Sequence, residues 1–331
     1  MLQVLLMLFF FAATALVPAS AWSQKALVVQ LHISRATRLM AFSPHPDDVT
    51  LGIGGLIQRV LQSGGKVEVV YMTSGDGFPV GVEMEDHVSI PTAMDYRQYG
   101  ALRRSEALGA TATLGLKKRN VIFLGFPDGG LSYLRSKFLA TRYPFTSPFT
   151  RQDSPPEYER IIPGAYYTGD DVIGEVERLI GEFRPTLVAT TPAQDWHPDH
   201  SATYFFVKRA LARWDKIHQN LNPMLITFLI HYGHWPVDQG SGAGSRLNPP
   251  KGFPDKGIQW VSSPLTPEEV KIKREAIQQF HSQMLIMGRF LMSFDRSNEL
   301  YILYKHSQKK AKGINPGRRI PRPPALPASR A

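Results

Sequence analysis

Two short motifs, far apart in the sequence, combine histidine and aspartate in a way that suits a metal site. The first is His45-Pro46-Asp47-Asp48, and the second is His197-Pro198-Asp199-His200. Each motif follows a short apolar run, so each is expected in a loop at the end of a buried strand. Groups gathered from distant strand ends mark a site rather than a local turn. We therefore predict that the two motifs form one metal site with its catalytic base.

The side chains in these motifs define the chemistry that they could perform. They supply three imidazoles and three carboxylates, and the chain contains no cysteine that could provide a thiolate. Two imidazoles and one carboxylate would leave a coordination position open for water, as in a catalytic zinc site. The other groups could serve as general base, oxyanion-binding group and orienting group, which amide hydrolysis requires. Spacing alone does not decide which His or Asp binds the metal.

A simpler interpretation is that each His-Pro-Asp turn only begins a helix, because Asp often caps a helix N-terminus. Either motif alone would allow this interpretation. Two such motifs after two predicted strands, in a chain with ten histidines, favour the shared site.

The elements that must position the motifs alternate between strands and helices. Apolar runs predict strands over 38–42, 67–72, 121–124, 186–190, 225–230 and 300–304, and helical patterns predict helices over 51–62, 99–114, 172–183, 202–214 and 267–287. This order favours a Rossmann-like α/β fold, a mostly parallel sheet with helices on both faces. Ligands of such folds bind beyond the carboxyl ends of the strands, where both motifs fall. The chain has no Gly-x-Gly-x-x-Gly motif, so we expect no dinucleotide.

Two long stretches interrupt this alternation and are expected to be loops. Residues 131–171 are rich in Tyr, Phe, Arg and Pro, and residues 233–264 are rich in Gly and Pro. Such loops often line a binding site, and aromatic and Arg side chains suit sugar rings and hydroxyls, although simple packing on the surface is the alternative. His231 and His234 follow a predicted strand, and we expect them to be plain loop residues rather than members of the site.

The N-terminus has the composition of a signal peptide. Residues 2–17 are apolar except for Gln3 and Thr14, and Ala19-Ser20-Ala21 follows as a cleavage pattern. We predict a signal peptide over residues 1–21, cleavage before Trp22 and export to the periplasm or the medium. An uncleaved membrane anchor is the alternative, although the apolar run is shorter than the ~20 residues that span a bilayer.

The C-terminus is basic and rich in proline. Residues 305–331 hold eight Lys or Arg residues and no acid, which predicts a disordered tail that carries most of the formal net charge of +10. The rest of the chain is close to neutral, so we expect no nucleic-acid partner. The tail could contact an anionic surface, or it could only aid solubility.

The motifs and their surroundings resemble the PIG-L/LmbE-like family of zinc-dependent de-N-acetylases, which act on N-acetylglucosaminyl conjugates. The resemblance extends over about residues 38–304, which implies one deacetylase domain over 22–304. The matching segments are Ala41–Asp48, Leu51–Gly55, Tyr71–Asp76, Arg103-x-x-Glu106 with Leu114-Gly115, Leu124–Gly129, His197–His200 and Lys273–Gln283. The pair formed by the first and the sixth of these segments is the most specific.

The resemblance implies a role for each candidate residue. The metal, Zn²⁺ or another divalent ion, would be bound by His45, Asp48 and His200. Asp47 would be the general base, and His197 would stabilise the oxyanion or act as an acid. The remaining matched residues would orient His197 or contact the substrate: Asp199 in the first role, and Arg103 and Asp128 in the second.

Two positions depart from the family pattern. The family usually has Glu where this chain has Val49, and some relatives have a carbonyl-polarising Tyr where this chain has Asp195. We predict a hydrolase that removes the N-acetyl group from an N-acetylglucosamine-type amino-sugar conjugate. The alternatives are a metal amidase of the same fold that cuts a non-sugar amide, and a non-catalytic carbohydrate-binding protein.

Overall fold

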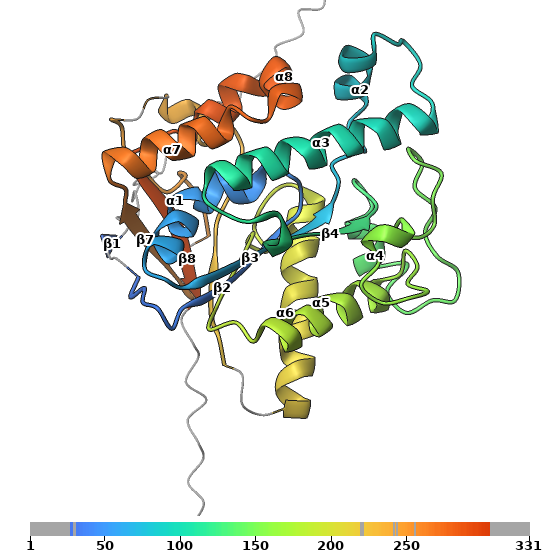
Figure 1. Ribbon diagram of the computed structural model, residues 1–331, viewed down its shortest axis with the longest axis horizontal. Helices are drawn as coiled ribbons and strands as arrows, with labels where there is room; N and C mark the ends of the chain where they lie inside the picture. Colours follow the sequence, from blue (N-terminus) through green and yellow to red (C-terminus); the bar gives the residue numbers. More distant parts are fainter. Residues whose placement is uncertain are drawn as a thin grey trace, which may run out of the picture.

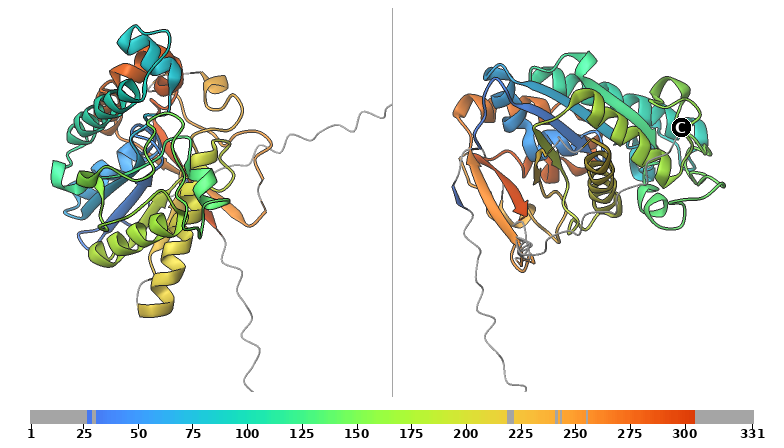
Figure 2. Two further views of the ribbon diagram at one scale, coloured as in Figure 1. Left: turned by 90° about the vertical axis from the view of Figure 1, so that its right-hand side faces the viewer. Right: turned by 90° about the horizontal axis from the view of Figure 1, so that it is seen from below.

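The computed structural model describes residues 27–28, 31–218, 222–240, 242, 244–254 and 256–304. The predicted signal peptide and basic tail lie outside these residues. An eight-stranded sheet crosses the described part of the chain in the order β1-β7-β8-β6-β5-β2-β3-β4. Helices cover both faces of the sheet (Figures 1 and 2). The predicted Rossmann-like α/β fold is confirmed.

The elements have the following bounds. The strands are β1 (Leu27–Val28), β2 (Arg38–Ser43), β3 (Lys66–Thr73), β4 (Val121–Phe126), β5 (Leu187–Thr190), β6 (Met224–Thr227), β7 (Ile258–Pro264) and β8 (Asn298–Tyr304). The helices are α1 (Asp48–Gln62), α2 (Pro79–Asp86), α3 (Ala93–Thr113), α4 (Leu131–Arg135), α5 (Gly169–Phe183), α6 (Pro198–His218), α7 (Pro267–Ile277) and α8 (His281–Met292). Within the described residues, no helix is both long and apolar enough to cross a bilayer.

The central strand β2 shows how the sheet separates two hydrophobic cores. It pairs in parallel with β3 on one side and with β5 on the other. Leu39 and Ala41 face the core that includes side chains of α1, α3, α7 and α8, whereas Met40 and Phe42 face the core of α4, α5 and α6. This alternation follows from the two-residue period of a strand, and both sets are apolar because both faces are covered.

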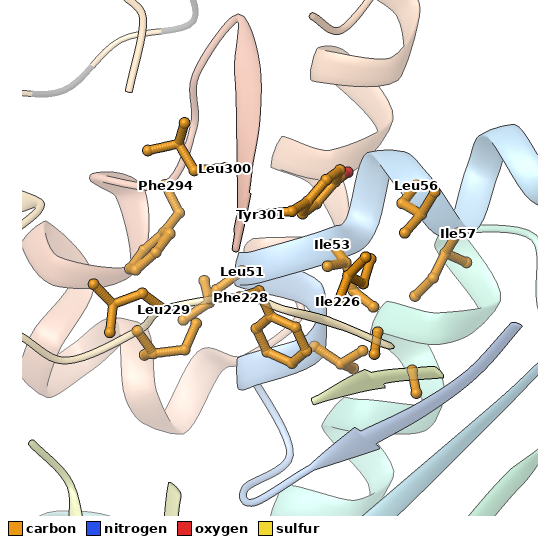
Figure 3. Packing of buried hydrophobic residues seen from close by; sticks show 14 of the residues in the cluster. Leu51, Ile53, Leu56, Ile57, Ile226, Phe228, Leu229, Phe294, Leu300 and Tyr301 are labelled. Atoms are coloured by element: carbon orange, nitrogen blue, oxygen red, sulfur yellow. The ribbon is translucent and has the colours of Figure 1, made fainter. Parts of the chain in front are cut away.

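Helix α1 follows the first motif directly and packs closely on the sheet. A side chain in place of Gly52 would overlap the ring of Phe228, which lies just beyond β6. Figure 3 shows Leu51, Ile53 and other α1 side chains packed against residues of the β6 segment and of β8. The absence of a side chain at Gly52 therefore lets the start of α1, and with it the first motif, lie close to the carboxyl end of β6.

A buried carboxylate joins α1 to the C-terminal part of the fold. The helix is kinked at Ile53, which leaves main-chain N–H groups free after the kink. Glu299 of β8 accepts hydrogen bonds from the N–H groups of Gly55 and Leu56 at 2.8 and 3.0 Å. The same carboxylate pairs with Lys273 of α7 at 2.8 Å. These bonds satisfy groups that would otherwise be buried without partners.

Two sequence expectations about the C-terminal part were wrong. The single helix predicted over 267–287 is broken, because Phe280 enters the core and Ser282 bonds through its N–H and its hydroxyl to Glu106 of α3, at 2.7 Å each. The predicted loop over 233–264 ends in strand β7, whose Trp260 is buried. By contrast, residues 131–171 are mostly irregular, as predicted, apart from α4, a short turn of 3-10 helix and the first residues of α5.

Candidate metal centre and active site

Five parallel strands deliver the candidate residues to one edge of the sheet. The loops after β2, β3, β4, β5 and β6 all lie at the carboxyl ends of these strands. The chain runs from β2 outward to β3 and β4 on one side, whereas β5 and β6 lie on the other side. The strand order therefore reverses between β2 and β5, which is where open α/β sheets bind ligands. The two motifs meet at this reversal.

The three predicted metal ligands converge on one point. His45 Nδ1 lies 3.1 Å from Asp48 Oδ2, His200 Nε2 lies 3.2 Å from the same oxygen, and the two nitrogens are 3.0 Å apart. Ligand atoms about 2.0–2.1 Å from a tetrahedral zinc ion would be separated by about 3.3 Å. All three side chains are buried. The ligand set therefore fits one divalent cation.

Neighbouring carboxylates orient both imidazoles towards this point. Asp195 Oδ2 lies 3.2 Å from His200 Nδ1, and Asp128 Oδ1 lies 3.1 Å from His45 Nε2. In each case the carboxylate charge favours a proton on the outer nitrogen, which leaves the lone pair of the inner nitrogen for the metal position. Carboxylates commonly orient metal-binding histidines in this way. Both histidines are thus set up as ligands rather than as core residues.

The electrostatics of this position favour positive charge. Burial opposes ionisation of His200, but the carboxylates of Asp195 and Asp48 outweigh it and raise its pKa to about 9. Burial would raise the pKa of Asp48, yet the charges of His200 and His45 hold it well below its usual range. A proton or a divalent cation could supply the positive charge that these groups stabilise.

Further potential ligands surround the same position. Three overlapping sets have ligand atoms within 4.8 Å of one another: His45 with His197 and His200, Asp48 with His200 and His231, and His45 with Asp128 and Asp199. The atoms of the predicted trio are all 3.0–3.2 Å apart, whereas His45 Nε2 lies 3.1 Å from Asp128 and 3.7 Å from Asp199 in the third set.

Asp47, the predicted general base, lies beside the trio and faces a different neighbour. Its Oδ2 is 3.3 Å from the guanidinium of Arg103, which also donates to the carbonyl of Gly75 at 3.0 Å. Burial raises the pKa of Asp47, and the charge of Arg103 opposes this rise. Asp47 and Arg103 both line the cavity described below. Arg103 therefore positions Asp47, and its predicted contact with substrate stays a prediction.

Asp128 and Asp199 have partners that the sequence did not indicate. Besides approaching His45, Asp128 accepts the N–H of Gly77 at 2.7 Å, so its role on substrate hydroxyls stays a prediction. Asp199 accepts the N–H of Gly129 at 2.7 Å through its carboxylate. Its contact with His197 is made instead by its main-chain N–H, 3.3 Å from Nδ1. Orientation of His197 by the Asp199 carboxylate stays a prediction.

Asp195, which had no assigned role, links several parts of the site. It accepts the N–H groups of His197, Ile230 and His231, each at 3.0 Å, in addition to approaching His200. The carboxylate therefore ties the second motif to the segment after β6. Its position two residues before that motif was the only sequence signal, and nothing in the spacing distinguished it from a loop residue.

His231 is a member of the site, and the expectation of a plain loop role was wrong for this residue. Its ring lines the cavity, lies 4.9 Å from that of His200 and stacks on Phe290 of α8 at 5.0 Å. Burial and the charge of His200 lower the pKa of His231 to about 4, so its imidazole is neutral. His234, by contrast, is exposed.

A cavity of about 300 Å³ opens onto these groups. Its polar side is formed by residues of the two motifs with Arg103, Asp128 and His231. Its other side is mostly apolar and comes from α1, the residue before α2, and α8: Leu51, Phe78, Met287 and Phe290. A mostly apolar wall with a few placed polar groups is typical of small-molecule sites.

Comparison with known proteins identifies the family of this chain. The family model for PIG-L, described as GlcNAc-PI de-N-acetylase, matches residues 40–211, slightly more than half of the chain. This range contains both motifs, Arg103 and Asp128. The model ends within α6, before His231 and the apolar wall that α8 contributes.

Individual relatives are more distant. The deacetylase 1 for 1D-myo-inositol 2-acetamido-2-deoxy-alpha-D-glucopyranoside from Saccharopolyspora erythraea is 26% identical over 229 residues, which are 68% of this chain and 71% of that protein. The deacetylase for the same compound from Mycolicibacterium smegmatis is 29% identical over 177 residues, 53% of each chain. The chain thus spans about half the length of the second relative.

Solved structures with a similar fold include two deacetylases. The N,N'-diacetylchitobiose deacetylase from Pyrococcus horikoshii is 19% identical with a TM-score of 0.46, covering 81% of this chain and 84% of its own. A zinc-inhibited form of teicoplanin deacetylase is 21% identical with a TM-score of 0.49, covering 82% and 100%. At these identities and TM-scores, neither structure indicates a substrate for this chain.

Proposed function

Because the chain belongs to the PIG-L family of GlcNAc-PI de-N-acetylases, we propose that it removes the N-acetyl group from an N-acetylglucosamine-type amino-sugar conjugate. The observation that carries the proposal is the convergence of His45, Asp48 and His200 within 3.0–3.2 Å, with Asp47 lining the same cavity as the first two. A carbohydrate-binding protein would not require this combination of metal ligands and base.

We propose that His45, Asp48 and His200 hold Zn²⁺ or another divalent ion. When bound, such an ion lowers the pKa of a water molecule and polarises a carbonyl group. The imidazole nitrogens and the carboxylate of this trio suit zinc, and the carboxylates of Asp195 and Asp128 lie beside the two histidines.

The side chains around this position supply the proton transfers. Asp47 takes a proton from the water that attacks the acetyl carbonyl, and its raised pKa makes it a stronger base than an exposed carboxylate. His197 accepts the N–H of Asp199 at Nδ1, which places its own proton on Nε2. It can therefore donate a hydrogen bond to the oxyanion. Breakage of the C–N bond then gives acetate and a free amine, with the proton that Asp47 took from the water returned to the amine nitrogen.

Acetate release from N-acetylated sugars tests the proposal. Purified protein loaded with zinc should release acetate and a primary amine from at least one N-acetylglucosaminyl conjugate in a panel, and Asp47→Asn should do so at least about a hundredfold more slowly. Release from non-sugar amides alone would favour the amidase alternative. Sugar binding without acetate release in the zinc-loaded protein would favour the carbohydrate-binding alternative.

We also propose that the enzyme is exported, on the composition of residues 1–21. Expression of the full chain in a bacterial host should yield a processed protein that begins at Trp22, which N-terminal sequencing would detect. An intact Met1 on a membrane-bound form would contradict the cleavage and favour the anchor.

A further inference from the structure

A large aromatic side chain is exposed at the residue next to a member of the cavity wall. Trp196 is 64% exposed, although the next residue, His197, lines the cavity. The main-chain N–H of Trp196 donates to the carbonyl of His231 at 2.9 Å, and His231 lines the cavity as well. Trp196 is therefore fixed by its backbone to two residues of the cavity wall, while its own ring lies at the surface.

The ring is held by a row of aromatic contacts that begins in the core. Trp260 is buried, and its ring centroid lies 5.1 Å from that of Phe253. The ring of Phe253 lies 5.0 Å from that of Tyr232, which lies 4.9 Å from that of Trp196. The hydroxyl of Tyr232 donates to the carbonyl of Gly252 at 2.9 Å, which fixes this ring in turn. Because Trp196 is supported in this way, a ligand that packs on it orders little that is not already ordered.

The size of the cavity determines where a longer substrate must go. About 300 Å³ is at the lower end of the range for ligand sites, so a conjugate with several rings has to extend beyond the cavity. A conjugate that leaves the cavity past His197 and His231 would reach Trp196, which precedes the first residue and bonds through its N–H to the second. Pyranose and cyclitol rings have apolar C–H faces, which an indole ring covers well.

We propose that Trp196, supported by Tyr232, forms a second sugar subsite, which binds the ring attached to the N-acetylated residue by stacking. The proposal rests on the proposed deacetylase function and extends it, since it makes Trp196 a determinant of preference for substrates with more than one ring. The acetylated ring lies in the cavity, and the next ring lies on the indole.

A comparison of one-ring and two-ring substrates tests this subsite. Trp196→Ala should raise KM for N,N'-diacetylchitobiose about tenfold, with kcat within about twofold, and should leave kcat/KM for N-acetylglucosamine unchanged. Trp196→Phe, which keeps an aromatic face, should recover most of the lost affinity. Tyr143→Ala is the matched control, because Tyr143 is 81% exposed and lies outside the cavity lining.

Each other outcome contradicts the proposal. An unchanged KM for the disaccharide would remove Trp196 as a subsite. An equal loss on both substrates would mean that Trp196 only positions His197. If no sugar is deacetylated at all, the proposed function fails, and a binding measurement then tests the subsite. Chitobiose is titrated by NMR into Asp47→Asn and into the double variant that also carries Trp196→Ala. Equal affinities of the two proteins for chitobiose, or no binding by either, would overturn the proposal.

Discussion

At the scale of single residues, two adjacent aspartates have different surroundings. Asp48 lies within 3.1–3.2 Å of two histidines, whereas Asp47 approaches a guanidinium at 3.3 Å. The difference arises because Asp47 immediately precedes α1 and Asp48 begins it, and successive side chains of a helix diverge. The two carboxylates can therefore serve one reaction in distinct roles.

Asparagine substitutions should separate these roles. Asp47→Asn keeps the shape of the side chain but cannot accept the proton, so turnover should fall by at least about a hundredfold while zinc content and substrate affinity stay near those of the wild type. Asp48→Asn removes the ligand charge and should lower zinc content. Elemental analysis with steady-state kinetics measures both effects. Zinc loss in Asp47→Asn, with retention in Asp48→Asn, would mean that the roles are exchanged.

The residues of the site differ in how far the sequence reveals them. The trio and Asp47 lie in two compact motifs, so their proximity was predicted, although the ligand choice came from the family resemblance. Asp195 and His231 carry no such signal, because their roles arise where the end of β6 approaches the second motif. That approach is a tertiary contact between segments, and no local pattern encodes it.

At the scale of elements, the apolar runs of β2 to β6 were recognised because strands covered on both faces are almost entirely apolar. Strand β7 follows a Gly/Pro-rich stretch, and its run is short, so its burial by β1 and β8 was not apparent. The break between α7 and α8 depends on the bonds of Ser282 to Glu106, which belongs to a distant helix. In both cases the deciding contacts are remote in sequence.

Helix α5 contains a buried acid that makes stability depend on pH. Glu175 accepts the N–H groups of Ile161 and Ile162 at 3.2 and 3.3 Å, and its Oε2 has no hydrogen-bond partner among the described residues. Burial raises its pKa from 4.5 to about 7. Since the folded state favours the protonated form, the stabilisation is complete below pH about 4.5 and is lost as the pH rises through about 7.

Glu175→Gln should therefore stabilise the protein at high pH only. The amide keeps an acceptor for the two N–H groups and cannot ionise, so the free energy of unfolding at pH 8.5 should rise by up to about 3 kcal/mol relative to the wild type, with little difference at pH 4.5. Urea unfolding at both pH values measures the change. Glu182→Gln on the same helix is the control, because Glu182 is exposed. A gain that is equal at both pH values would contradict the role of ionisation.

At the scale of the whole molecule, the metal position joins two halves of the sheet. His45 and Asp48 follow β2, whose chain continues to β3 and β4, whereas His200 follows β5, which pairs with β6. A cation bound by all three would connect loops that are otherwise held by separate strands. A ligand that binds only the folded state stabilises it by mass action, so the ion should stabilise the domain as a whole.

Removal of the metal should accordingly lower the melting temperature. Zinc at about a hundred to a thousand times its dissociation constant contributes about 3–4 kcal/mol, which corresponds to roughly 5–15 °C for a domain of this size. Differential scanning calorimetry of chelator-treated protein, before and after addition of one equivalent of zinc, would show this shift.

His200→Ala should lose this stabilisation by zinc, because two ligands on one loop cannot connect the two halves of the sheet. Asp47→Asn should keep it, since Asp47 is assigned to the water and not to the ion. An equal zinc response in His200→Ala would show that the ion binds elsewhere, and an absent response in Asp47→Asn would make Asp47 a ligand.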